Sequence, residues 1–150
     1  MAICFFIGHR DTLPSILPKL REMVERHITE YGVTEFVVGR YGSFDSLAAQ
    51  VIKEAKQRHP EIRLTLLLPY YDPIKPLELP RGFDGSLYPD GLERIPKRAT
   101  IVRANQYMVC HSDYLIAYDA GRIGNTRKLV EDARHREVKG MIHVENLACV

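Results

Sequence analysis

The sequence FVVGRYGSFDSLAAQVI, residues 36–52, passes from an apolar run through two glycines into a helical pattern. The run that ends at Val38 predicts a short strand over 35–38 that is covered on both faces, and Gly39 ends it. Ser43 is the predicted N-cap of the following helix. The apolar positions of that helix share one face: Phe44, Leu47, Ala48, Val51, Ile52 and Ala55.

The same alternation of strand and helix recurs along the chain. Further strands are predicted over four apolar runs: 3–7, 64–68, 114–118 and 141–144. Helical patterns lie between them, at 13–28, at 100–111 and behind GRIGNT at 121–126. We therefore expect an α/β fold, a Rossmann-like three-layer sandwich with a central, mostly parallel five-stranded sheet. Residues 1–150 are expected to form a single domain.

Composition and charge argue against several classes of protein. Hydrophobic residues make up 45% and charged residues 27% of the chain, as in an ordinary globular domain. A formal charge of +2 argues against a nucleic-acid partner, and no apolar run approaches the roughly 20 residues of a membrane span. Three distant cysteines, Cys4, Cys110 and Cys149, predict reduced thiols and a cytoplasmic location. The six histidines show no metal-ligand spacing, so no metal site is predicted.

Glycine and arginine occur together after three of the predicted strands. The segments are GHRD at 8–11, GRYGSFD at 39–45 and DAGRIGNT at 119–126. The carboxyl ends of parallel strands share one edge of the sheet, where ligands bind in such folds. The three segments together therefore predict one site, although ordinary turn chemistry is the alternative for any one of them.

The residue types in these segments favour an anionic ligand. Glycines let backbone N–H groups approach closely, helix N-termini carry partial positive charge, and Arg10, Arg40 and Arg122 add donors suited to phosphate. Asp45 and Asp119 would repel phosphate, so we expect them to accept hydrogen bonds from ribose hydroxyls. These features predict a nucleotide or sugar phosphate, against the alternative that each arginine is only a solvated charge.

The segment 69–98 has neither a helical nor a strand period, which predicts a functional loop or lid. Its tyrosines Tyr70, Tyr71 and Tyr88 either stack on a base or pin the segment to the body of the domain. His9 either contacts a phosphate or base, or bonds a backbone carbonyl. The basic side chains of the segment either cover a phosphate or form a plain solvated surface: Arg81, Arg94, Lys97 and Arg98.

The order and spacing of these motifs resemble the SLOG superfamily, named for Smf/DprA and the LOG enzymes, and within it the small YpsA-like branch. GRYGSFDSLAA at 39–49 is similar to the branch pattern G-x-x-x-G-x-D-x-x-A-A, with Ser43 where a second glycine often stands. The pattern R-x-N-x-x-M-V-x-x-S-D is matched at 103–113, and Y-D followed by G-x-T is matched at 118–126. GHR after the first strand and Pro69 after the third also fit, so the resemblance covers nearly the whole chain.

The resemblance implies a Rossmann-like domain that binds a nucleotide or a nucleotide-derived ligand. An ADP-ribose-like molecule is included in this class, and no cofactor is required. The resemblance adds Arg103 and Asn105 to the residues that the loops supply. The predicted ligand-binding residues are Gly8, His9, Arg10, Gly39, Arg40, Gly42, Ser43, Asp45, Arg103, Asn105, Asp119, Gly121, Arg122, Gly124, Asn125 and Thr126.

Members of the wider group that act as enzymes cleave the N-glycosidic bond of a nucleoside 5′-phosphate. The LOG-type enzymes use a PGGxGTxxE loop. This chain keeps Gly124 and Thr126 but has Leu129 at the position of the glutamate. The sequence therefore leaves enzymatic activity undecided. The catalytic residues are unknown, and the candidates are Asp45, Asp119 and Arg103.

Four functions are compatible with these patterns. The first is a bacterial cytoplasmic protein that binds a nucleotide-type ligand as a sensor or regulator, with a homodimer implied by the resemblance alone. The alternative is an N-glycosidase, or phosphoribohydrolase, that acts on a nucleoside 5′-monophosphate or a NAD-derived molecule. A single-stranded nucleic-acid binder is disfavoured by the modest charge. An interaction module with purely structural glycine loops is the fourth. The sequence does not identify the base.

Overall fold

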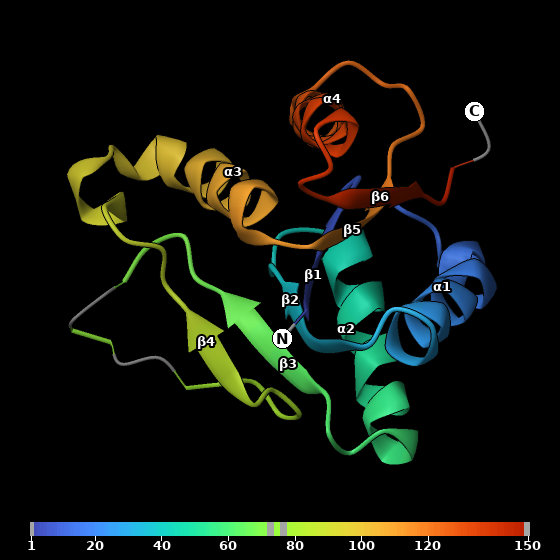
Figure 1. Cartoon of the computed structure of the whole chain (residues 1–150). Coiled ribbons are helices and arrows are strands. Elements are labelled where there is room, and N and C mark those ends of the chain that lie inside the picture. Colours follow the sequence, from blue (N-terminus) through green and yellow to red (C-terminus); the bar gives the residue numbers. More distant parts are fainter. Residues whose placement is uncertain (1, 72–73, 76–77, 149–150) are drawn as a thin grey trace.

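The structure, a computed structural model, describes residues 2–71, 74–75 and 78–148. Its centre is a sheet in the order β4-β3-β2-β1-β5-β6 (Figure 1). The strands are β1 Ala2–Gly8, β2 Val33–Val38, β3 Arg63–Leu67, β4 Gly85–Leu87, β5 Tyr114–Tyr118 and β6 His143–Asn146. The helices are α1 Leu17–Thr29, α2 Ser43–Arg58, α3 Thr100–His111 and α4 Asn125–Val138, with short 3-10 turns η1 Pro14–Ile16, η2 Leu92–Arg94 and η3 Lys97–Ala99. Cys149 lies outside the described residues.

The sheet has six strands, so the prediction of five strands was wrong in number. Every described strand pair is parallel, as expected for a mostly parallel sheet. The additional strand, β4, lies inside the segment without a period. Asp84 directly precedes it and accepts hydrogen bonds from the Leu64 backbone N–H (2.8 Å) and the Lys56 ammonium (2.6 Å). Long-range contacts therefore position this strand, and a local pattern cannot reveal them. The other five strands end within two residues of the predicted limits.

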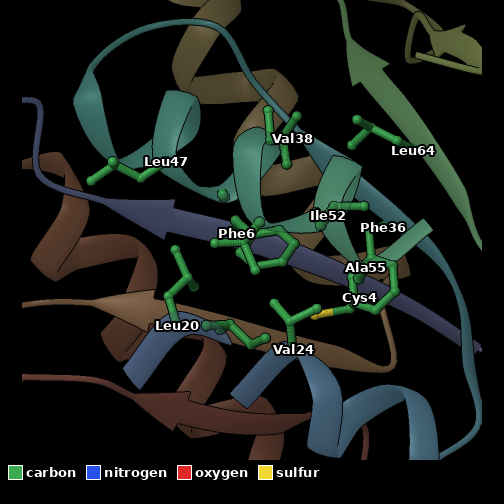
Figure 2. Close-up of a cluster of buried hydrophobic side chains, with 14 of the residues drawn as sticks. Cys4, Phe6, Leu20, Val24, Phe36, Val38, Leu47, Ile52, Ala55 and Leu64 are labelled. Carbon is green, nitrogen blue, oxygen red and sulfur yellow. The ribbon is translucent and has the colours of Figure 1, made fainter. Parts of the chain in front are cut away.

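Hydrophobic residues fill both faces of the sheet and give the predicted three layers. Side chains alternate along β1, so Cys4 and Phe6 face α1 and α2, whereas Phe5 and Ile7 face α3 and α4. Figure 2 shows Cys4 and Phe6 among side chains from these two helices. Across the described part of the chain, none of the helices is both long and apolar enough to cross a bilayer.

The strand order reverses at the centre of the sheet. From β1 the chain builds β2, β3 and β4 outward on one side, and then returns through α3 to place β5 beside β1. Figure 1 shows α3 making this return across the sheet. The loops after β1 and β5 therefore diverge to opposite faces and leave a crevice between them, which is the usual ligand position in open parallel sheets.

His27, near the end of α1, is a polar side chain buried among aromatic rings. Its Nδ1 lies 2.7 Å from the Met23 carbonyl oxygen, so this nitrogen carries the proton and donates it. Tyr31 and Tyr114 meet its ring edge-on, with centroids 4.9 and 5.4 Å away. Among the described residues its Nε2 has no hydrogen-bond partner. Burial lowers the pKa of His27, because a charged ring would lose its hydration there.

The wild-type protein is therefore expected to lose more stability between pH 7.5 and pH 5 than a His27→Leu variant. The unfolded chain takes up a proton near pH 6.5, whereas the buried ring takes it up only at lower pH. Below pH 6.5 the unfolded state binds more protons, so this group makes the free energy of unfolding fall as the pH falls. Urea unfolding of both proteins at the two pH values measures the difference.

The matched control is His111→Leu. In the wild type, the His111 Nδ1 lies 2.8 Å from the carbonyl oxygen of Tyr107, four residues earlier, which is the same local arrangement as at His27. Unlike His27, His111 is exposed. This variant removes an exposed side chain and should change the free energy of unfolding at pH 7.5 by no more than about 0.5 kcal/mol. A pH dependence in His27→Leu equal to that of the wild type would contradict the prediction.

Candidate functional site

A cavity of about 750 Å³ opens at the carboxyl edge of the sheet, where the strand order reverses. The loops after β1, β2 and β3, the start of α4 and one face of α3 form its walls. Its volume lies in the range of small-molecule sites. The residues lining it are Phe6, Ile7, Gly8, His9, Arg10, Asp11, Gly39, Tyr41, Asp45, Leu67, Pro69, Arg98, Ile101, Val102, Ala104, Asn105, Arg122, Asn125, Thr126 and Leu129.

The structure brings many of the predicted site residues together at this cavity. Those in its walls are Gly8, His9, Arg10, Gly39, Asp45, Asn105, Arg122, Asn125 and Thr126. Those outside its walls are Arg40, Gly42, Ser43, Arg103, Asp119, Gly121 and Gly124. The second group belongs largely to the turns that hold the first group in place.

Two of these turn residues, Gly42 and Ser43, join the β1 and β2 loops. Gly42, not Ser43, is the N-cap of α2, with φ of 125°. A Cβ on Gly42 would lie 2.8 Å from the Arg10 Cα, so the two backbones approach too closely for a side chain. The Ser43 N–H donates to the Arg10 carbonyl (2.8 Å), and its hydroxyl donates to the Thr12 carbonyl (2.7 Å). The predicted cap is therefore a cross-link between loops.

Asp45 places a carboxyl group in the cavity wall at the first turn of α2. Its Oδ2 accepts a hydrogen bond from the Tyr41 backbone N–H (3.2 Å). A Cβ on Gly39 would lie only 2.9 Å from this same oxygen, so the glycine leaves room for the carboxylate. Burial raises the pKa of Asp45 to about 6, and the Tyr41 N–H offsets this only in part. At neutral pH the group is an ionised acceptor with little water around it.

His9 lines the cavity between the β1 and β5 loops. Its Nε2 accepts a hydrogen bond from the Ala120 backbone N–H at 2.9 Å, which requires a neutral ring with its proton on Nδ1. Burial and the Arg122 charge lower the pKa of His9 and favour the same neutral form. One of the two alternatives for His9 was a bond to a backbone carbonyl. The backbone group that His9 contacts is an N–H instead. His9 thus brings a polar ring to the cavity without a positive charge.

Asp119 stabilises its own loop outside the cavity walls. Its Oδ1 accepts from the Gly121 backbone N–H (2.9 Å), while its backbone exchanges two hydrogen bonds with the Asn146 side chain (3.0 Å each). This local turn is typical of aspartate. One oxygen of the Asp119 carboxylate therefore stabilises the turn that leads to α4. Of the two aspartates predicted to meet ribose, only Asp45 lies in the cavity wall.

Helix α3 and the turn before it contribute one face to the cavity. The lining positions Arg98, Ile101, Val102 and Asn105 are spaced by three, four and seven residues, as on one side of a helix. Arg103 lies off this face and is exposed. The helical spacing of these four residues is the signal in the sequence that could have identified Arg98. Two further lining residues with polar side chains were not among the predicted site residues. They are Asp11 in the β1 loop and Tyr41 in the β2 loop.

Cationic side chains surround the opening of the cavity. Arg10 and Arg98 are exposed, and within the described ranges no ion pair involves either of them. The Arg122 Nη1 donates to both carboxylate oxygens of Asp11 at 2.9 Å and so links the β1 and β5 loops. Arg10 and Arg98 are therefore available to an anionic ligand, and Arg122 is available by exchange with Asp11.

Hydrophobic side chains and free backbone donors complete the cavity. Ile101 and Val102 of α3 and Leu129 of α4 give the cavity an apolar wall. Asn125 and Thr126 are the first residues of α4, where backbone N–H groups lack partners within the helix. The cavity thus combines cations, a helix N-terminus, an apolar wall and the half-buried carboxylate of Asp45. No group of three or more His, Cys, Asp or Glu side chains suited to a metal ion occurs among the residues described.

Comparisons with known proteins bear on the fold alone. No family model matches the chain, and no curated protein matches it. Among solved structures, the chain is similar to the Moco carrier protein of Chlamydomonas rheinhardtii, with 16% sequence identity and a TM-score of 0.50. The match covers 97% of this chain and 90% of the carrier protein. Together with the parallel sheet and its flanking helices, the likeness establishes a Rossmann-like α/β fold over almost the full length.

Proposed function

We propose that this protein binds a nucleotide or a nucleotide-derived phosphate ester in the cavity at the carboxyl edge, and that it acts as a sensor or regulator. One observation carries the proposal: Arg10 and Arg98 bring two cations to the same cavity as the half-buried carboxylate of Asp45. A phosphorylated sugar needs both kinds of group, because its phosphate is an anion and its hydroxyls are donors.

Each part of such a ligand has a matching wall. The phosphate fits between Arg10, Arg98 and the N-terminus of α4. Asp45 accepts hydrogen bonds from the ribose hydroxyls, and its shortage of water favours such partners. The apolar side chains of Ile101 and Val102 cover one face of the base.

Binding without catalysis is the form that we favour. Leu129 is buried and lines the cavity at the position of the LOG-type glutamate, so this position has no carboxylate. We keep the YpsA-like branch of the SLOG superfamily and a bacterial, cytoplasmic homodimer as parts of the proposal, on the resemblance in sequence alone.

A hydrolase is the second candidate because of Asp45. Its raised pKa, about 6, lies close to that of an effective general base at neutral pH. Asp45 would accept a proton from water while the water oxygen bonds to the anomeric carbon. The C–N bond would break, and the base would leave with the electron pair and take up a proton. Release of ribose 5-phosphate from a nucleoside 5′-monophosphate would establish this activity, and its absence would support a binding protein.

A thermal-shift experiment with AMP, GMP, CMP, UMP, NAD and ADP-ribose tests the binding proposal. A ligand at 100 times its Kd adds about 2.7 kcal/mol to the free energy of unfolding. For a domain of this size the melting temperature should rise by roughly 5–10 °C. If none of the six ligands shifts a well-folded sample, the proposal is wrong and the glycine loops are structural.

Arg98→Ala is expected to weaken binding of the ligand found in that experiment by about tenfold to a hundredfold, since a charge-assisted hydrogen bond is worth roughly 1.5–3 kcal/mol. Arg103→Ala is the matched control, because it removes the same charge from the same region but lies off the cavity face. Isothermal titration calorimetry measures both affinities. Equal losses in the two variants would indicate a general charge effect and contradict the proposed phosphate position.

A further inference from the structure

A second hollow, of about 350 Å³, lies beside the cavity and is lined by aromatic side chains. We call it the tyrosine pocket. Its main lining residues are Tyr70, Tyr71, Tyr88, Leu92, Ile95 and Lys97. Leu92 is buried, whereas Tyr70 and Tyr71 are 41% and 58% exposed. Aromatic rings thus face an open hollow with an apolar side chain beneath.

The tyrosine pocket and the cavity adjoin at two places in the chain, which form the wall that they share. Along the backbone, Pro69 lines the cavity and Tyr70 lines the tyrosine pocket. In the turn η3, Arg98 lines the cavity and Lys97 lines the tyrosine pocket. Burial of the Tyr41 side chain, which lines the cavity, together with its interaction with the Tyr70 hydroxyl, raises the pKa of Tyr41 to about 12. The two hollows therefore adjoin along 69–70 and 97–98.

The boundary between the two hollows is cationic. Lys97 and Arg98 are both exposed and follow each other in η3, so they offer positive charge on either side of the shared wall. The Lys97 Nζ lies 4.5 Å from the centroid of the Tyr70 ring. A cationic ligand group would be repelled by Lys97 at this ring, whereas a phosphate bridge near Lys97 and Arg98 would be attracted.

The lining chemistry selects a planar ring for the tyrosine pocket. Every nucleobase has a flat π-face that stacks on an aromatic side chain, largely irrespective of its ring substituents. Tyr70, Tyr71 and Tyr88 provide such faces, and Leu92 provides an apolar contact. Glu93 and Lys97 provide an acceptor and a donor for the polar edge of the ring.

We propose that the tyrosine pocket is a second subsite, which takes the distal aromatic ring of a ligand whose first nucleoside lies in the cavity. The ligand class is a dinucleotide, in which a pyrophosphate joins two ring-bearing nucleosides across the wall at Lys97 and Arg98. This inference rests on the proposed function, because the cavity must hold the first nucleotide. A second subsite would explain why the segment 69–98 carries exposed tyrosines beside the cavity.

Calorimetric titration with NAD, and separately with its halves AMP and nicotinamide mononucleotide, tests the inference. The wild type should bind NAD at least about tenfold more tightly than either half, since each stacked base contributes about that much. Tyr70→Ala should remove this tenfold advantage and leave the affinity for the more tightly bound half unchanged. Tyr70→Phe keeps the ring and should keep the advantage.

Two controls make the outcomes distinct. Tyr107→Ala removes a tyrosine that stacks on His111 outside both hollows, and it should bind NAD like the wild type. The chain has no tryptophan, so its intrinsic fluorescence reports tyrosine, and NAD should quench it more than the halves do. If Tyr70→Ala keeps the full advantage, or weakens NAD and the halves equally, the inference is overturned while the proposed function stands. If the wild type binds none of the six ligands named above, the proposed function fails as well.

Discussion

Replacing Asp45 by asparagine is expected to raise the free energy of unfolding at pH 7.5 by about 2–3 kcal/mol and to weaken nucleotide binding by about tenfold or more. The pKa of Asp45 rises from the ordinary 3.8 to about 6 in the folded protein. Between these values the folded state keeps a proton that the unfolded state has released. Stability from this group is therefore lost as the pH rises from about 4 to about 6, by about 1.4 kcal/mol for each pH unit in that interval.

Asparagine removes that cost because it stays neutral, yet it keeps the local geometry. Its amide oxygen can still accept from the Tyr41 N–H, and its similar size still fits against Gly39. Its amide also brings donors, so it is a poorer partner for hydroxyl groups that donate to the Asp45 carboxylate. The protein thus trades stability for a charged acceptor in its cavity, as functional sites often do.

Urea unfolding of wild type and Asp45→Asn at several pH values measures this effect. The gain in stability should be largest above pH 7 and should shrink toward zero as the pH falls below about 4, since Asp45 is then protonated in both states. Asp132→Asn is the control, because that carboxylate is exposed on α4 and its loss should change stability by no more than about 0.5 kcal/mol. A stability gain in Asp45→Asn that does not depend on pH would contradict this account of Asp45.

The second large effect is expected at Gly8, the last residue of β1. Gly8→Ala should lower the free energy of unfolding by about 3 kcal/mol, at the upper end of the usual cost of overpacking. A Cβ at this position would lie 2.2 Å from the Phe44 Cγ and 2.7 Å from the Phe44 Cβ. Phe44 is fully buried and packs against Phe6 and Tyr118, so its ring has little space to move away.

Chemical denaturation of a double-mutant cycle tests this explanation. Phe44→Ala alone should cost about 3–5 kcal/mol through the cavity it leaves. The double variant with Gly8→Ala should cost less than the sum, because the added methyl group then enters vacated space. Gly85→Ala is the control, since a Cβ there would meet only the end of the flexible Arg63 side chain, at 3.1 Å. Additive costs in the cycle would show that the loss at Gly8 has another origin.

The sequence was sufficient for those elements whose pattern is local. The apolar runs predicted five of the strands, and the periodicity around Phe44 predicted α2. The pattern failed at β4, which spans three residues and depends on contacts between Asp84 and residues that lie 20 or more positions earlier. A period-based prediction needs more residues than this strand contains.

The sequence predicted which residues meet at one edge of the sheet where backbone direction alone decides their position. Gly8 ends β1, and Gly39 and Asp45 come after β2. The carboxyl ends of these strands meet at one edge, so all three residues line the cavity. On α3 the outcome depended on the rotation of the helix, which a motif does not specify. Asn105 faces the cavity, whereas Arg103 does not.

Local hydrogen bonds decided the remaining cases. Asp119 and Ser43 were predicted to contact the ligand, but neither lines the cavity, and their side chains hydrogen-bond to backbone groups of the surrounding loops. Short polar side chains in turns often do this, and the sequence does not reveal which partner is nearest. Arg98 was assigned only to a basic segment, because the turn that aims it at the cavity precedes the helix.

The position of β1 at the centre of the sheet has a consequence for synthesis on the ribosome. β1 pairs with β2 through Phe5 and Val37, but its other neighbour supplies Leu115, more than 100 residues later. At a synthesis rate of about 5–20 residues per second, one edge of β1 waits roughly 4–15 s for β5 after β2 has emerged. The nascent chain must therefore keep one edge of an apolar strand unpaired during that time, and the cavity cannot form before α4 begins to emerge. A ligand can stabilise only a chain that already extends to α4, so binding cannot guide the early steps of folding.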